Sequence, residues 1–212
     1  MKILALLILT FGAWAQVADD ANKGYKTKEG RDKVAAGLDD PHRDGRQKPL
    51  ELVAAMNIRP GMTVADIGTG TGYMLKFLSD AVGPTGKVYG EDIQTDFLDR
   101  ARAKNVPNTE FILGTTTDPK LPPDSVDIAL VLDVYHHFDY PDKMLAAIRS
   151  ALKPGAHLVI VDYYKSASPS PGHIRLERDD VAAEIEHIGF HLLAKREHIP
   201  KTQYMLTFEK SK

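Results

Sequence analysis

Apolar residues from residue 49 onward alternate between strand-like and helix-like patterns. Short, nearly continuous apolar runs predict buried strands, and the segments between them carry apolar residues at helical spacing. The predicted strands are Met62–Ile67, Lys87–Ile93, Thr109–Leu113, Ser125–Val134 and Ala156–Tyr163. The predicted helices are Tyr73–Val82, Thr95–Asn105, Pro141–Leu152 and Arg178–Ile188, preceded by one that starts at Pro49 and buries Leu50, Val53, Ala54 and Met56. Such alternation predicts a parallel sheet covered by helices on both faces.

The end of the chain follows a different pattern. Two strand-like runs, His191–Ile199 and Gln203–Glu209, are separated only by Pro200, Lys201 and Thr202. A parallel crossover needs a dozen or more residues, so this short link predicts an antiparallel hairpin. The sequence therefore predicts an α/β, Rossmann-like fold: a seven-stranded, mostly parallel sheet with helices on both faces and a C-terminal antiparallel hairpin.

The first 48 residues do not share this alternation. An apolar run follows Lys2 and ends in Ala13-Trp14-Ala15, which is the layout of a secretory signal peptide. The run is shorter than the roughly 20 residues that a transmembrane helix needs. We expect residues 1–15 to be cleaved on export, leaving a periplasmic or secreted protein without a membrane span. An uncleaved signal would leave it cytoplasmic or membrane-tethered. Residues 16–48 are polar and predict a flexible lead-in, before one domain at 49–212.

Composition narrows the possible partners. The 212 residues include no cysteine, which excludes disulfides, thiolate metal sites and cysteine nucleophiles. A formal net charge of −2 offers no broad basic surface for nucleic acid, so a small-molecule partner is expected. The sequence does not indicate an oligomeric state.

A glycine-rich loop, DIGTGTG at residues 66–72, follows the first predicted strand. Open α/β sheets bind ligands at this position, and glycine lets the backbone approach a ligand closely. Folds that bind nicotinamide dinucleotides place the third glycine one residue later. Asp66 would repel a phosphate but suits the ammonium group of a methionine moiety. The loop therefore favours S-adenosylmethionine (SAM) over a nicotinamide cofactor.

An acid also ends the second predicted strand, some twenty residues beyond the loop. A carboxylate at this position can accept hydrogen bonds from both hydroxyls of a ribose. Alternation along a strand points Glu91 and Asp92 to opposite faces, and Asp92 stands at the strand end. We therefore assign the ribose contact to Asp92.

Three further motifs follow the glycine loop: VYGEDI, LPPDSVDIALVLDVYHHF and LKPGAHLVIVDYY. Together with the loop, they make the chain resemble the SAM-dependent methyltransferase family that includes the ubiquinone/menaquinone C-methyltransferases. The segment DPHRDGRQKP at residues 40–49 is similar to that of exported bacterial methyltransferase-domain proteins. The resemblance implies SAM as cofactor, and a cofactor site formed by Asp66, Gly68, Thr69, Gly70, Gly72, Tyr73, Asp92, Ile93, Thr115, Thr116 and Asp133. Many relatives have Gly-Asp-Ala where this chain has Gly114-Thr115-Thr116, so Asp118 or a backbone carbonyl would have to hold the adenine.

The acceptor side is less defined by the sequence. Asp133, at the end of the fourth strand, would face the sulfonium and the acceptor, and His136 is the second catalytic candidate. Because relatives often carry a histidine at the place of His137, a positioning role is favoured for it. Adjacent histidines on an extended segment point apart, so no metal site is predicted. The patches Arg43–Lys48 and His173–Arg175 are either acceptor contacts or solvated surface.

The predicted function is transfer of the SAM methyl group to an unidentified small-molecule acceptor. The alternative is an exported protein with this fold that binds a ligand or partner without turnover. A nicotinamide-dependent oxidoreductase is disfavoured by the glycine spacing.

Overall fold

The computed structural model describes residues 16–168, 170 and 172–211, so the predicted signal segment lies outside the described residues. Seven strands form one sheet in the order β3-β2-β1-β4-β5-β7-β6. Their bounds are β1 Thr63–Ile67, β2 Lys87–Asp92, β3 Thr109–Leu113, β4 Val126–Leu132, β5 Leu152–Tyr163, β6 Phe190–Ile199 and β7 Gln203–Lys210. The first five strands pair in parallel, whereas β7 pairs antiparallel with both β5 and β6. The predicted sheet and hairpin are confirmed.

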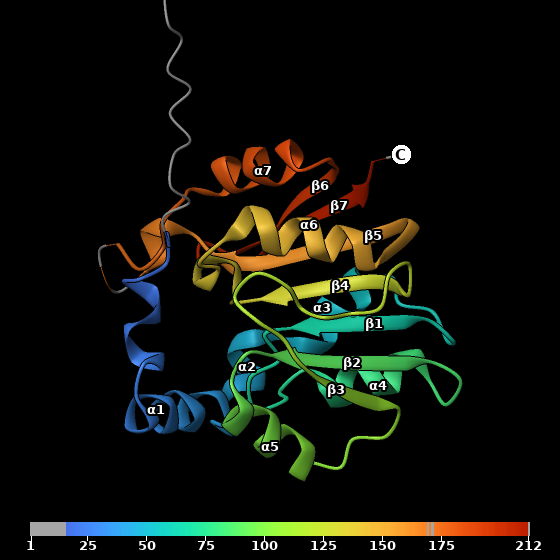
Figure 1. Cartoon of the computed structure of the whole chain (residues 1–212), viewed down its shortest axis with the longest axis horizontal. Helices are drawn as coiled ribbons and strands as arrows, with labels where there is room; N and C mark the ends of the chain where they lie inside the picture. The colour runs from blue at the N-terminus through green and yellow to red at the C-terminus, as the bar shows by residue number, and fades with distance from the viewer. Residues whose placement is uncertain (1–15, 169, 171, 212) are drawn as a thin grey trace, which may run out of the picture.

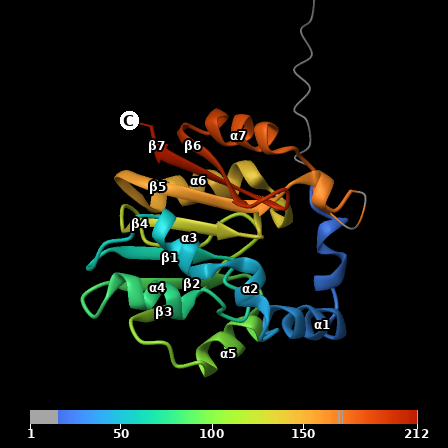
Figure 2. The same cartoon turned by 180° about the vertical axis from the view of Figure 1, so that it is seen from behind.

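Helices cover both faces of the sheet (Figures 1 and 2). Their bounds are α1 Lys28–Leu38, α2 Arg43–Gln47, α3 Pro49–Ala55, α4 Leu75–Val82, α5 Thr95–Ala103, α6 Pro141–Ala151 and α7 Arg178–His187. Three 3-10 turns are η1 Ala21–Tyr25, η2 Tyr135–His137 and η3 Lys165–Ala167. In the described part of the chain, no helix is long and apolar enough to cross a bilayer.

The central strands bury both of their faces, which explains their nearly continuous apolar sequence. In β4, Ala129 and Val131 join the core cluster that includes α6 and α7, whereas Ile128 and Leu130 join the cluster that includes α3 and α4. Two predicted core residues are placed differently. Leu50 is 71% exposed and Ala54 is exposed, whereas Leu52 of α3 is fully buried. The sheet is thus a rigid platform whose strand ends hold the loops described below.

The segment at residues 16–48 is not the flexible lead-in expected from its composition. It forms η1, α1 and α2, which lie along the carboxyl ends of the strands, in blue in Figure 1. Arg31 donates a hydrogen bond to Asp96 of α5 at 2.8 Å, and the Tyr25 ring contacts Phe97 edge to face. The segment has too few apolar residues to pack by burial alone, so this hydrogen bond and this ring contact hold it against the domain. The segment thereby closes over the strand ends.

Candidate functional site

A cavity of about 310 Å³ opens at the carboxyl ends of β1, β2 and β4. This is where open α/β sheets bind ligands, and the volume lies in the range of small-molecule sites. Nine of the predicted cofactor residues line it: Asp66, Gly68, Thr69, Gly70, Tyr73, Asp92, Ile93, Thr116 and Asp133. Gly72, Thr115 and His136 are not in its wall. The strand ends therefore bring together most of the site that the sequence predicts.

The glycine loop turns sharply between β1 and α4. Gly68 and Gly70 have φ angles of 70° and 57°, which favour glycine. A Cβ on Gly68 would lie 2.6 Å from Val134 Cγ1. Gly72 serves packing, because a Cβ there would lie 2.8 Å from Leu75 Cδ1. The first two glycines thus give the cavity a wall of bare backbone.

Two buried carboxylates line the cavity beside this loop. Asp66 accepts a 2.6 Å hydrogen bond from the Thr69 hydroxyl, and burial raises the pKa of Asp66 to about 6. Asp92 accepts hydrogen bonds from the backbone N–H of Gly70 at 2.9 Å and of Gln94 at 2.8 Å. Burial raises the pKa of Asp92 to about 6 as well. A ligand that carries a positive charge or donates hydrogen bonds would therefore stabilise the ionised form of both carboxylates.

Glu91 also reaches the cavity wall, although strand alternation suggested that it would point away. Its Oε2 accepts a 3.2 Å hydrogen bond from the Gly68 N–H, and its Oε1 has no partner among the described residues. Burial, followed by the neighbouring Asp92 charge, raises the pKa of Glu91 well above its usual value. Burial thus favours the protonated form of Glu91, and its side chain holds the Gly68 N–H of the glycine loop.

Asp133 follows β4 with a φ of 56°, an uncommon conformation for a residue other than glycine. Its Oδ1 accepts a 2.6 Å hydrogen bond from Gln203 Nε2, and its Oδ2 lies 4.0 Å from Arg43 Nη2. Burial and then the Asp162 charge raise the pKa of Asp133 to about 7, against the effect of Arg43. The carboxyl group is thus positioned to exchange a proton near neutral pH.

The residues of the predicted Arg43–Lys48 patch have separate environments. Arg43 lines the cavity, with its guanidinium 3.9 Å from the centre of the Tyr73 ring. Gln47 is buried and donates a hydrogen bond to Gln203 at 3.1 Å, whereas Arg46 pairs with Asp40 at the surface. Of this patch, only Arg43 lines the cavity, whose wall also includes Lys26.

The residues of the turn after β3 also differ in whether they line the cavity. Thr116 lines the cavity, but the N–H of Thr115 donates to the Asp118 carbonyl at 2.9 Å. The Asp118 carboxylate accepts hydrogen bonds from the backbone N–H and the ammonium of Lys120, each at 2.7 Å. Asp118 is therefore engaged with Lys120 and is not part of the cavity wall, whereas Thr116 is.

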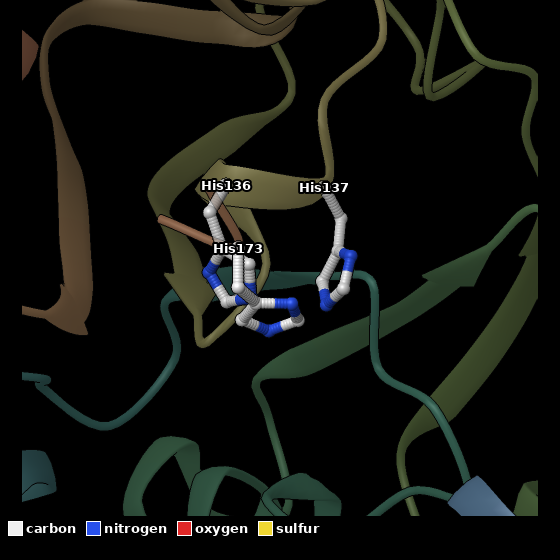
Figure 3. A group of neighbouring side chains, drawn as sticks. All are labelled: His136, His137 and His173. Atoms are coloured by element: carbon white, nitrogen blue, oxygen red, sulfur yellow. The ribbon is translucent and has the colours of Figure 1, made fainter. Parts of the chain in front are cut away.

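His136 and His137 lie in η2, so the expectation that they point apart along an extended segment is wrong. Their ring centres are 4.1 Å apart, and His173, from the loop before α7, lies 4.9 Å from His136 and 5.7 Å from His137 (Figure 3). His137 lines the cavity, while His136 is buried behind it and bonds to Asp162 at 2.7 Å. The rest of the His173–Arg175 patch is structural, since Ile174 is buried and Arg175 pairs with Glu184 at 2.7 Å.

The three rings differ in their affinity for protons. Burial and then the neighbouring His136 lower the pKa of His137 well below its usual value, and the same causes lower that of His173. Burial opposes protonation of His136, but the charge and hydrogen bond of Asp162 outweigh it and raise the pKa of His136. His137 and His173 are therefore neutral imidazoles at neutral pH.

Comparison with known proteins identifies the architecture around this cavity. Residues 65–160 match the family described as a methyltransferase domain. A ubiquinone/menaquinone biosynthesis C-methyltransferase of Burkholderia orbicola (strain MC0-3) is 31% identical over 121 residues, covering 55% of this chain and 49% of that protein. The crystal structure of a SAM-dependent methyltransferase from Aquifex aeolicus has a TM-score of 0.79 at 28% identity, covering 84% of this chain and 97% of the other. These findings support a class I SAM-dependent methyltransferase family for this chain.

The chain spans about half the length of the Burkholderia relative, and 32% of an uncharacterized 37.1 kDa protein in transposon Tn4556 of Streptomyces fradiae, to which it is 35% identical over 111 residues. SAM is the cofactor of this methyltransferase family, and the cavity fits it. Gly68 and Gly70 line the cavity at positions where a Cβ would clash with Val134 and Leu38, while Asp66 and Asp92 are buried acids at the cavity wall.

Several residues of the candidate site were not found from the sequence. Asn22, Tyr25 and Leu38 line the cavity from the N-terminal segment, whose polar composition gave no signal. Asp162, the acid near the end of β5, holds His136. It could have been found by the same reasoning that selected Asp66, Asp92 and Asp133, because all four are acids at strand ends.

Proposed function

We propose that this protein transfers the methyl group of SAM to a small-molecule acceptor that enters beside Asp133 and His137. The observation that carries the proposal is the order of acids along adjacent parallel strands. Asp92 ends β2, Asp66 lies in β1, and Asp133 follows β4, and all three line one cavity. This order supports contacts to ribose, methionine and reacting methyl group in turn.

The methionine end of SAM carries both an ammonium and a carboxylate group. The Asp66 carboxylate suits the ammonium, whereas Arg43 offers a guanidinium on the same cavity wall. Arg43 stacks on Tyr73, so its guanidinium is held in place without a close carboxylate partner: Asp133 Oδ2 lies 4.0 Å away. We therefore assign the SAM carboxylate to Arg43. In this arrangement Asp92 accepts from the ribose, and Ile93 and Thr116 contact the adenine.

Bound SAM supplies a methyl group that its sulfonium already activates. The protein has to orient the acceptor and exclude water, a contribution that can reach about 7–11 kcal/mol. Tyr25, Phe138 and Met144 give the acceptor side of the cavity a largely apolar wall. Asp133, with its pKa raised to about 7, can take the proton that an acceptor releases.

The first test is ligand selectivity. Titration calorimetry of residues 16–212 should show binding of SAM and S-adenosylhomocysteine but not of NAD or NADP. Methyl transfer is then tested with labelled SAM and fractionated small-molecule extracts. Binding of NADP without SAM contradicts the assignment, and SAM binding without any labelled product in a broad screen favours the non-catalytic alternative.

We also propose that the protein is exported and that residues 1–15 are removed, because the short apolar run ends in a cleavage-like Ala13-Trp14-Ala15. Mass spectrometry of native protein from fractionated cells tests this. A periplasmic or secreted protein that begins at Gln16 is the expected result. Intact Met1 on a cytosolic protein would overturn it, and would place the enzyme beside the cytosolic SAM pool.

A further inference from the structure

We propose that His136, His137 and His173 bind one zinc ion at the acceptor side of the cavity. One ring nitrogen from each histidine lies within 4.8 Å of the others (Figure 3). Zinc holds imidazole nitrogens at about 2.0–2.1 Å, which places tetrahedral ligands roughly 3.3 Å apart. The distances between the three nitrogens therefore exceed the tetrahedral value by at most about 1.5 Å.

The hydrogen bonds around His137 fix which of its nitrogens is free to bind a metal. The Asn22 amide donates to the His137 carbonyl and to Asp139 Oδ1, each at 3.0 Å. Both amide hydrogens are thereby used, so Asn22 Oδ1 must accept the 2.9 Å hydrogen bond that joins it to His137 Nδ1. Nδ1 therefore carries the proton, and Nε2 has the lone pair. The Tyr25 hydroxyl donates a long, 3.4 Å hydrogen bond to this nitrogen and would have to turn away for a metal to bind.

His136 is held in the same way by a carboxylate. Its Nδ1 lies 2.7 Å from Asp162 Oδ1, and its backbone N–H donates to Asp162 Oδ2 at 3.0 Å. Proteins commonly orient a metal-binding histidine by such a bond from its other nitrogen to a carboxylate or carbonyl oxygen. Two of the three rings thus already have the supporting contacts of metal ligands.

His173 is the ligand that has to move. Its ring lies beside the rings of His136 and His137, and among the described residues no side-chain hydrogen bond fixes it. It belongs to the loop between η3 and α7 and is only partly buried. A small shift of this loop would close the three nitrogens around an ion.

Three histidine ligands leave one zinc position open, as in catalytic zinc sites. His137 stands in the cavity wall, so the open position would face the acceptor. Zinc lowers the pKa of an oxygen that it binds. We therefore infer an acceptor with an ionisable oxygen, such as a phenol; this part rests on the proposed function. The oxygen would lose its proton to Asp133, form the O–C bond as the C–S bond breaks, and release S-adenosylhomocysteine.

Zinc binding is tested without SAM or acceptor, so its outcome is independent of the proposed function. Tag-free protein, stripped with a chelator and dialysed, is titrated with zinc chloride by calorimetry, with magnesium chloride as a control. We expect one zinc per chain and no magnesium binding, because magnesium prefers oxygen ligands. Cobalt should give the intense visible bands of a four-coordinate site.

His173→Ala should abolish zinc binding at concentrations that saturate the unmodified protein, and Asn22→Ala should weaken it about 10- to 100-fold, as loss of such a supporting contact does. His191→Ala, an exposed histidine outside the cluster, is the matched control and should bind normally. Circular dichroism confirms that each variant is folded. Equal zinc affinity of His173→Ala and His191→Ala, or no zinc binding by the unmodified protein, overturns the proposal.

Discussion

The two sides of the cavity are built in different ways. The cofactor side centres on strand ends and the loop at residues 66–72, whose backbone N–H groups bond to the end of β2: Gly70 to Asp92 across 22 residues and Gly68 to Glu91 across 23. The acceptor side is assembled from distant segments: Asn22 bonds to His137 across 115 residues, and Gln203 bonds to Asp133 across 70. Backbone geometry therefore defines the cofactor side, whereas long-range side-chain contacts define the acceptor side. Substitutions should accordingly separate cofactor binding from acceptor chemistry.

The largest expected effect is at Gly68, on the backbone-defined side. Gly68→Ala places a Cβ 2.6 Å from Val134 at a φ of 70°. Left-handed backbone costs about 1–2 kcal/mol and overpacking about 1–3, so we expect a loss of roughly 2–5 kcal/mol in unfolding free energy, together with loss of SAM binding. Urea unfolding and calorimetry measure the two quantities.

Gly37→Ala is the matched control for that substitution. Gly37 lies in α1, and a Cβ there meets no atom within 4 Å. Alanine in a helix interior is favoured over glycine by about 0.5–1 kcal/mol, so this variant should be slightly more stable and bind SAM normally. If both variants behave alike, the glycine loop is not constrained as the structure indicates.

The second largest effect concerns Asp92. Asp92→Ala should weaken SAM binding by about 1.5–3 kcal/mol, the usual range for hydrogen bonds to a charged group. Asp99→Ala is a suitable control, since Asp99 is an exposed aspartate of neighbouring α5 that pairs with Arg102. Calorimetry compares the two variants. An equal SAM affinity would remove Asp92 from the cofactor site.

These contacts explain why the sequence predicts the cofactor side of the cavity better than the acceptor side. Asp66 and Asp92 stand at ends of apolar runs, so the pattern of β1 and β2 locates them without knowledge of the fold. Nothing in the pattern pairs Asn22 with His137, or turns Tyr135–His137 into a 3-10 turn. Such placements depend on tertiary packing, which no local period encodes. The N-terminal segment was misjudged for the same reason.

The third prediction is a pH dependence of SAM binding. Asp66 and Asp92 have pKa values raised to about 6 by burial, and SAM requires their ionised forms. SAM affinity should therefore fall as the pH is lowered through 6, roughly tenfold per carboxylate at pH 5. Calorimetry between pH 7.5 and 5 measures it, and a flat profile would show that neither carboxylate ionises on binding.

Stability of the free protein should change in the opposite direction. A carboxyl whose pKa is higher in the folded state than in the unfolded state binds more protons when folded. Between pH 4 and 6, these two groups therefore make the free protein less stable as the pH rises. Urea unfolding with and without saturating SAM should show that SAM reverses this contribution.

The smallest expected effect distinguishes two adjacent acids at the end of β2. Glu91 is buried with its pKa raised well above its usual value, and its Oε1 has no partner among the described residues. Because burial favours the protonated form, which resembles glutamine in shape and charge, Glu91→Gln should change unfolding free energy and SAM affinity less than the other substitutions do. Asp92→Asn, one residue away, removes a charge that the ligand needs and should weaken SAM binding clearly. If Glu91→Gln impairs SAM binding as much as Asp92→Asn does, the ribose contact belongs to Glu91, and the strand-end argument that selected Asp92 is wrong.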